Sequence, residues 1–151
     1  MDKRKLNWEK ILIAYYGFLQ GLHLLTLARA GYYMFFLDIV PFPILPPPTG
    51  WMPQTMPFML GLAGMDIVGI VLAFILVYQK LMQNKLRPVI GLISLTIFIS
   101  GAIVFAVGTL PSGAWAAHPL SYVSMVLLFT PTLPLYVKLA MIIHQEKVIN
   151  P

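Results

Sequence analysis

The sequence predicts an all-α fold, an integral membrane four-helix bundle that forms one domain over residues 1–151. Of these residues, 59% are hydrophobic and only 10% are charged, whereas a soluble domain carries about 25% charged residues. The chain also contains four apolar segments, each close to the ~20 residues that cross a bilayer core. Lysine and arginine, in addition, gather on one side of these segments. Together, the observations exclude a soluble globule, a disordered chain and a nucleic-acid-binding domain, despite the isoelectric point of about 9.6.

The first expected helix covers residues 8–36, with its most apolar part at 11–30. A secretory signal peptide is the alternative, because basic residues precede the apolar run and Ala28-Arg29-Ala30 resembles a cleavage site. The run is, however, longer than the about 7–15 apolar residues of such a peptide. Gln20 and His23 also interrupt it. We therefore expect a retained membrane span.

The connection that follows, residues 38–57, is rich in proline and nearly uncharged. Because proline lacks a backbone N–H, this stretch can form neither a helix nor a central strand. Polyproline II segments or tight turns are expected instead. The connection is therefore either a stiff linker or a lid over a cavity between the helices. Its prolines and large aromatic residues are Pro41, Phe42, Pro43, Pro46, Pro47, Pro48, Trp51, Pro53 and Pro57.

The remaining expected helices cover residues 58–79, 88–110 and 120–144. Pro88 stands in the first turn of the third, where its missing N–H costs no hydrogen bond. Small residues allow helices in a membrane to approach closely. They recur here at Gly17 and Gly21, at Gly69 and Ala73, and at Ser94, Gly101 and Gly108.

The fourth helix contains two prolines three residues apart, Pro131 and Pro134. They must kink or partly unwind the helix and thereby free backbone carbonyls. Free carbonyls at membrane depth are tolerated only against protein or a wet cavity. The segment is therefore either a structural kink or the wall of a central cavity, which Thr130 and Tyr136 would line.

The basic residues predict the orientation. The connections 38–57 and 111–119 contain no lysine or arginine, and such a bias places the basic side of a membrane protein in the cytoplasm. Both termini are then cytoplasmic, in an inner or plasma membrane or in the endoplasmic reticulum of a eukaryote. The net charge of +5 reflects topology and contact with anionic lipid. The basic residues on the expected cytoplasmic side include Lys3, Arg4, Lys5, Lys10, Lys80, Lys85, Arg87, Lys138 and Lys147.

Asp66 is the one acidic residue expected in the membrane interior. Burying a charge there is costly, so an ionisable residue at this depth is a candidate functional site. No lysine or arginine lies at a similar depth. At ~1.5 Å per residue, His23 on the antiparallel first helix lies only a few Å from the depth of Asp66. We therefore expect Asp66 either to be protonated or to pair with His23.

A polar stripe accompanies this pair, because Tyr16, Gln20 and His23 share one face of the first helix. An Asp–His pair can relay protons, bind a cationic amine or perform acid–base chemistry on a lipophilic substrate. It can also be a single interhelical hydrogen bond worth ~0.6–2 kcal/mol. No metal-ligand spacing occurs, and no cofactor is expected. The candidate ligand-binding residues are Asp66, His23, Gln20, Tyr16, Thr130 and Tyr136.

These features resemble the EXPERA family, the four-helix membrane proteins that include the emopamil-binding sterol isomerase and the sigma-two receptor. The likeness consists of a long connection after the first helix, Asp66 in the second, the basic turn Leu86-Arg87-Pro88-Val89-Ile90 and the proline-broken fourth helix. The resemblance implies a central cavity for sterol-like or cationic amphiphilic ligands, or an isomerase acting on such a lipid. The family's acidic residue in the first helix and the isomerases' His and Glu set have no counterpart here.

Three classes of function follow. The chain binds a lipophilic ligand, such as a sterol, an isoprenoid or a cationic amphiphile, in an intramembrane cavity around Asp66 and His23. Alternatively, it is a non-catalytic accessory subunit of a larger membrane complex, in contact with a partner protein or a second copy. The third class is an enzyme acting on an isoprenoid or sterol-like lipid. Membrane lipids are partners in all three, and nucleic acid in none.

Overall fold

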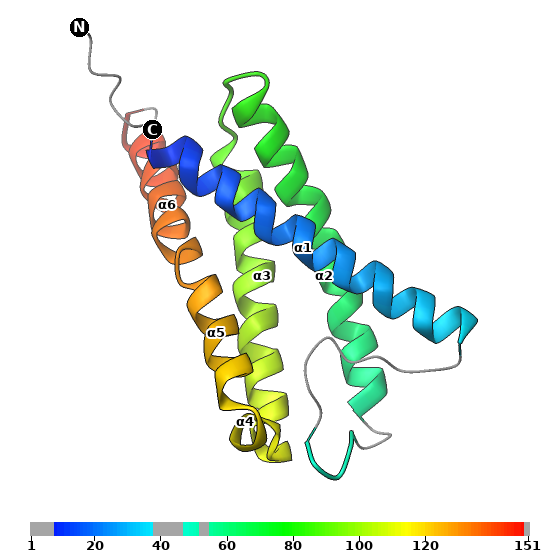
Figure 1. The fold of residues 1–151 in the computed structure, drawn as a ribbon. Helices are drawn as coiled ribbons and strands as arrows, with labels where there is room; N and C mark the ends of the chain where they lie inside the picture. Colours follow the sequence, from blue (N-terminus) through cyan, green and yellow to red (C-terminus); the bar gives the residue numbers. More distant parts are fainter. Residues whose placement is uncertain (1–7, 38–46, 52–54, 150–151) are drawn as a thin grey trace, which may run out of the picture.

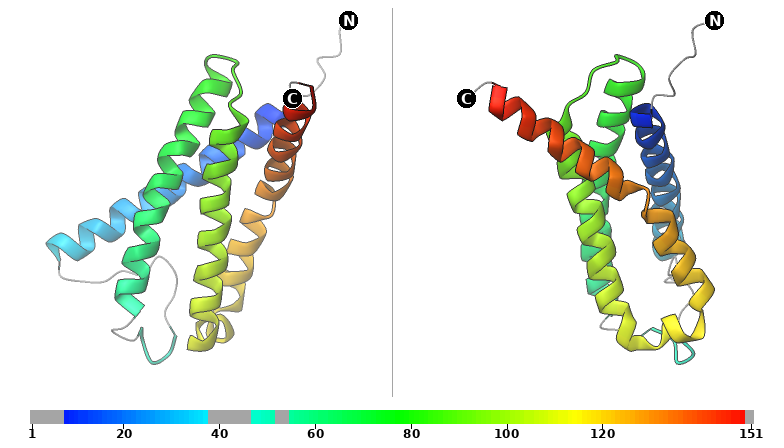
Figure 2. Two further views of the ribbon diagram at one scale, coloured as in Figure 1. Left: turned by 180° about the vertical axis from the view of Figure 1, so that it is seen from behind. Right: turned by 90° about the vertical axis from the view of Figure 1, so that its left-hand side faces the viewer.

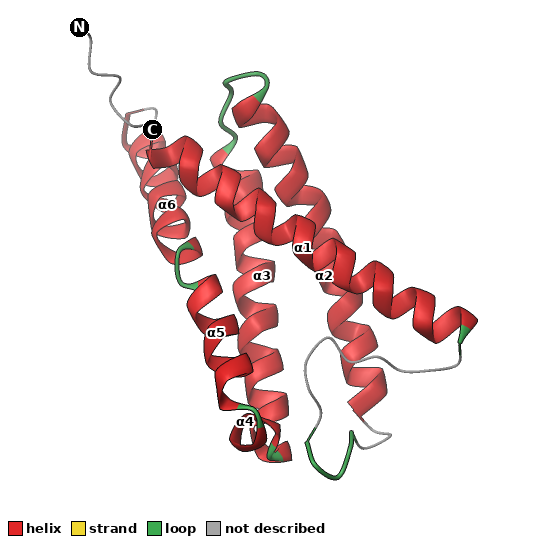
Figure 3. Cartoon of the chain, in the orientation of Figure 1, coloured by secondary structure: helices red, strands yellow, loops and turns green. Residues whose placement is uncertain are grey.

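The computed structural model describes residues 8–37, 47–51 and 55–149, and the ordered elements within them are all helices. The prediction of an all-α fold is therefore confirmed for this part of the chain (Figure 3). In chain order the elements are α1 (Trp8–Phe36), α2 (Thr55–Leu81), α3 (Pro88–Thr109), the 3-10 turn η1 (Leu110–Ser112), the single turn α4 (Ala114–Ala117), α5 (Pro119–Phe129) and α6 (Thr132–Ile149).

Four stretches of the described chain are long and apolar enough to cross a membrane: Trp8–Phe36, Pro57–Leu81, Pro88–Ser112 and Pro119–Gln145. They correspond to the four predicted segments, although α2 extends beyond the predicted range 58–79 at both ends. The fourth stretch is two helices, α5 and α6, rather than one.

The helices form an open bundle around the antiparallel pair α2 and α3 (Figure 1). α1 crosses α2 obliquely, and α6 lies against α3 and the first part of α1. We call the end where α1 begins, α6 ends and α2 turns into α3 the terminal end, and the end with η1 and α4 the loop end. Toward the loop end, α1 leaves the bundle and projects beyond α2 (Figures 1 and 2).

The buried side chains form two clusters. The larger joins α1, α2, α3 and α6 in the terminal half of the bundle, and it includes Tyr16, Leu76, Phe98 and Leu139. The smaller lies at the loop end around Phe105, Ala114 and Tyr122, and Trp51 from the proline-rich connection packs against it. The part of the connection that the structure describes therefore folds against the helices. Residues 38–46 and 52–54, with Pro41, Phe42, Pro43, Pro46 and Pro53, lie outside the described residues.

The predicted break in the fourth segment is present at Thr130 and Pro131, and Pro134 falls in the first turn of α6, where proline is tolerated. The backbone N–H of Leu133 donates to the Thr130 carbonyl at 3.1 Å. The Phe129 carbonyl, its usual α-helical acceptor, takes the Thr132 hydroxyl at 2.7 Å instead.

A second hydroxyl reaches this break from another helix. The Tyr15 hydroxyl on α1 donates to the Leu128 carbonyl at 2.8 Å. In an uninterrupted helix that carbonyl would accept from the N–H four residues later. Hydroxyl groups thus satisfy carbonyls that the break exposes, and this favours the structural kink over the wall of a cavity.

Candidate functional site

His23 and Asp66 meet where α1 crosses α2. The His23 Nε2 atom lies 3.3 Å from Asp66 Oδ2, so the predicted approach of the two side chains is confirmed. The Asp66 side chain is 11% exposed and the His23 side chain 28% exposed. The carboxyl group is therefore enclosed between helices, while one side of the imidazole remains accessible.

Gly101 on α3 makes the room for this carboxyl group. A Cβ atom at Gly101 would stand 3.2 Å from Asp66 Oδ1, closer than ordinary van der Waals contact. By contrast, Gly64, two residues before Asp66 on α2, has open space at the corresponding position. The seventh-residue spacing of small residues on α3 had indicated packing alone. At Gly101 the small residue also borders the candidate site.

The ring of Phe98 on α3 packs against the same site, and nothing in the sequence beyond its hydrophobicity indicated this role. Its ring lies edge-on to His23 at a centroid distance of 6.3 Å and to Tyr16 at 5.7 Å. It also contacts Phe129 of α5 at 4.8 Å. Phe98 is 5% exposed, so its ring packs behind the His23–Asp66 pair and is not itself open to a ligand.

Tyr16, one end of the predicted polar stripe, is used for packing. Its hydroxyl lies 2.7 Å from Ser94 Oγ, and Ser94 Oγ donates to the Gly69 carbonyl at 2.8 Å. A serine hydroxyl has one proton, so Tyr16 is the donor and Ser94 the acceptor. This chain joins α1, α3 and α2, and Tyr16 and Ser94 are both fully buried. Ser94 had been singled out for its size alone.

Gln20 lies between Tyr16 and His23 on the same face of α1. It is 1% exposed, and its Nε2 atom has no hydrogen-bond partner among the described residues. A buried amide without an acceptor costs about 1–3 kcal/mol. The residue next to the His23–Asp66 pair therefore presents two donors for which the described chain supplies no acceptor.

Thr130 and Tyr136 lie elsewhere, on the fourth segment. Thr130 is exposed, and its hydroxyl donates to the Val126 carbonyl at 3.1 Å. Tyr136 packs against the larger core cluster and lines a hollow of about 330 Å³ on α6, together with His144. The structure thus divides the six candidate residues into a set on α1 and α2 and two residues at separate places along α5 and α6.

A charged cluster at the terminal end was not predicted from the sequence. Glu9, in the first turn of α1, forms ion pairs with Lys80 near the end of α2 and with Lys138 of α6, the latter at 3.2 Å. Three helices therefore meet around one carboxylate. The sequence had placed these residues at the cytoplasmic ends but contained no sign of the register that joins them.

Among the described residues, no group of three His, Cys, Asp or Glu side chains could hold a metal ion. Comparison with protein-family models, curated proteins and solved structures finds no match to this chain. The resemblance to the EXPERA family stays a prediction, and the function must be argued from the geometry of the site.

Proposed function

We propose that the chain is an integral membrane protein with four spans that binds a lipophilic ligand at His23 and Asp66. The observation that carries the proposal is the 3.3 Å pair between α1 and α2, in which the carboxyl group is enclosed and the imidazole remains accessible. A ligand with a cationic or hydrogen-bonding head would place that head at the pair. Its apolar body would lie along the adjoining exposed surface of α1.

The arrangement of charge supports membrane insertion with both termini in the cytoplasm. Lys80 stands in the last turn of α2 and Arg87 directly before α3, so both belong to the terminal end, where Lys138 of α6 pairs with Glu9. The connections 38–57 and 111–119, which contain no lysine or arginine, follow α1 and α3 at the opposite side. Cytoplasmic loops carry this excess of basic residues in membrane proteins.

Two features favour a binding site over a simple interhelical hydrogen bond. A purely structural pair is best satisfied when both partners are closed off from their surroundings, as Tyr16 and Ser94 are. His23 is more open than either. The neighbouring Gln20 amide, moreover, has donors without an acceptor in the described chain. A ligand head would meet the accessible side of the His23 imidazole.

A second candidate function, the accessory subunit, is favoured by the loop-end half of α1. This half leaves the bundle (Figure 1), and Leu25, Phe35 and Phe36 are 68%, 84% and 76% exposed. Arg29 lies on the same half, over the ring of Tyr33 at 5.4 Å. A helix of a partner protein or of a second copy could cover this surface and supply a carboxylate to Arg29.

The ligand proposal is tested by purifying the protein in mild detergent and identifying the lipophilic molecules that it retains by mass spectrometry. We expect the native protein to retain a defined species, and Asp66→Asn to lose most of it. Gly101→Ala, which places a methyl group against Asp66, should reduce retention several-fold. Gly64→Ala is the matched control, because its methyl group meets open space.

The structural alternative has a different signature. If Asp66 only joins helices, Asp66→Asn lowers the melting temperature and the native protein retains no defined species. Unchanged retention together with unchanged stability in Asp66→Asn would contradict both roles of the residue.

A further inference from the structure

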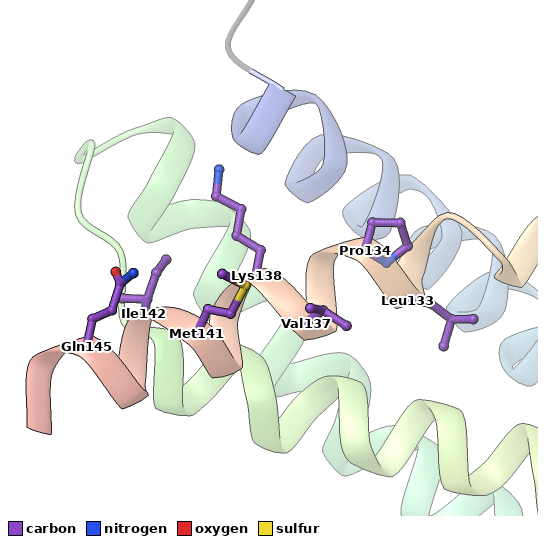
Figure 4. Close-up of a pocket in the computed structure, with 7 residues that line it drawn as sticks. All are labelled: Leu133, Pro134, Val137, Lys138, Met141, Ile142 and Gln145. Carbon is purple, nitrogen blue, oxygen red and sulfur yellow. The ribbon is translucent and has the colours of Figure 1, made fainter. Parts of the chain in front are cut away.

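A groove lies along the surface of α6, apart from the His23–Asp66 pair (Figure 4). Its volume is about 630 Å³. The side chains that line it recur at spacings of three and four residues, so they occupy one face of the helix. Between Pro134 and Gln145 the groove is about 16 Å long at ~1.5 Å per residue. Its apolar lining includes Pro134, Val137, Met141 and Ile142, and its polar lining Lys138 and Gln145.

The groove combines an apolar floor with a basic rim. The carbon stem of Lys138 lines the groove, and its ammonium group extends toward α1 (Figure 4). There it pairs with Glu9, which is also paired with Lys80. Two lysines thus share one carboxylate, and the cluster keeps an excess of one positive charge.

Lys138 is the member of this cluster that another ligand can reach. Its side chain is 42% exposed, whereas that of Lys80 is 13% exposed. An ammonium group has three N–H donors, and the contact with Glu9 uses only part of this capacity. Gln145 lies two turns further along the same face and adds an exposed amide.

The level of the groove in the membrane follows from the ion pairs, given the proposed insertion. Glu9 is in the first turn of α1 and Lys80 in the last turn of α2. These helix ends mark the cytoplasmic boundary, so Lys138 lies at the height of the lipid headgroups. From there the groove passes Val137 and Pro134 toward the membrane interior. Anionic lipids are concentrated in this leaflet and attract basic residues.

We propose that this groove binds an anionic phospholipid. One acyl chain lies along Val137 and Pro134, the phosphate accepts a hydrogen bond from Lys138, and Gln145 lies on the headgroup side of that contact. The proposal rests on the membrane insertion proposed above and is independent of ligand binding at Asp66. The excess positive charge is what separates this site from ordinary contact between apolar helices and lipid tails.

The test compares phosphatidylglycerol with phosphatidylcholine of identical acyl chains, added to the detergent-purified protein and counted as bound lipids by native mass spectrometry. The native protein should prefer phosphatidylglycerol by about fivefold, which corresponds to about 1 kcal/mol for a lysine at an anionic surface. Lys138→Gln should abolish the preference, and Lys138→Arg should keep it. Lys85→Gln is the matched control, since it removes an exposed lysine from the same end of the bundle without touching the groove.

Glu9→Gln separates lipid binding from a purely structural role of Lys138. Because it removes the only carboxylate of the cluster, it should raise the preference for phosphatidylglycerol while it lowers the melting temperature. If Glu9→Gln and Lys138→Gln both lower stability and neither shifts the headgroup preference, the proposal is wrong. It is equally wrong if the variant Met141→Cys crosslinks two copies in native membranes, because the groove is then filled by protein. Asp66→Asn should keep the preference, so failure of this site is distinguishable from failure of the other.

Discussion

The hydrogen bonds that join three helices at Ser94 lead to a prediction about the order of three variants. The Tyr16 hydroxyl donates to Ser94, and Ser94 donates to the Gly69 carbonyl. Ser94→Ala leaves the fully buried Tyr16 hydroxyl without an acceptor. Tyr16→Phe leaves nothing comparable, because Ser94 keeps its own acceptor at Gly69. The two partners of one hydrogen bond should therefore differ in their importance for stability.

The magnitudes follow from this difference. A hydrogen bond between membrane helices contributes about 0.6 kcal/mol on average, and a buried donor left unsatisfied costs about 1–3 kcal/mol. We expect Tyr16→Phe to lower the free energy of unfolding by about 0.5–1 kcal/mol and Ser94→Ala by about 1.5–3 kcal/mol. The double variant should be more stable than Ser94→Ala alone, because it no longer contains the unpaired hydroxyl.

The free energy of unfolding can be measured by titrating the protein in mixed micelles with a denaturing detergent and following helicity by circular dichroism. The double-mutant cycle isolates the coupling between the two hydroxyls, which are in direct contact. The assignment of Tyr16 as donor to Ser94, and of Ser94 as donor to Gly69, is wrong if Tyr16→Phe is the more destabilising single variant. It is also wrong if the double variant is less stable than Ser94→Ala.

Two further predictions concern helix packing and the break between α5 and α6. Gly17→Ala should lower the free energy of unfolding by about 1–3 kcal/mol, because its Cβ would stand 2.8 Å from a methyl group of Val77. Gly21→Ala is the control: its methyl group meets open space, so it should be nearly neutral in the same titration. Tyr15→Phe removes the hydroxyl that reaches the Leu128 carbonyl, so it should destabilise the protein by about 0.5–1.5 kcal/mol and speed hydrogen exchange in α5; unchanged exchange there would contradict the assigned contact.

The features that the sequence predicted correctly are mostly those that depend on a single helix. Apolar length predicted the four stretches that are long enough to cross a membrane, and the missing N–H of Pro131 predicted the break, because both effects are local. The approach of His23 to Asp66 could also be predicted. Two helices joined by one connection run antiparallel, so the relative depth of their residues follows from the rise of ~1.5 Å per residue.

What the sequence could not predict depends on the register and rotation between helices. Glu9 and Lys138 are far apart in the chain, and their contact requires α6 to cross α1 at a particular height. The same holds for the hydroxyl of Tyr15 at the Leu128 carbonyl. Thr130 and Tyr136 were assigned to the site because a proline break frees carbonyls. Hydroxyl groups satisfy carbonyls at this break instead, and nothing in the linear order of residues specifies where those hydroxyls come from.

The ligand and subunit proposals involve two different faces of α1, and this makes them separable. On this helix Tyr16 and Gln20 are buried. The His23 side chain, where α1 begins to leave α2, is 28% exposed. A ligand would reach the pair from that side. Leu25, two residues further along the helix, lies on the opposite face of α1 and is 68% exposed, so a partner helix could cover it without closing this approach.

Because the chain contains no cysteine, a single cysteine at Leu25 can be labelled specifically in native membranes with a lipophilic maleimide. The cysteine at Leu25 should be labelled rapidly, with or without a retained ligand, if this face of α1 is open to lipid. Tyr16→Cys, at a buried position, should be labelled slowly and serves as the control. Protection at Leu25 that disappears on detergent extraction would instead show that a partner covers this face of α1, as the accessory-subunit proposal requires.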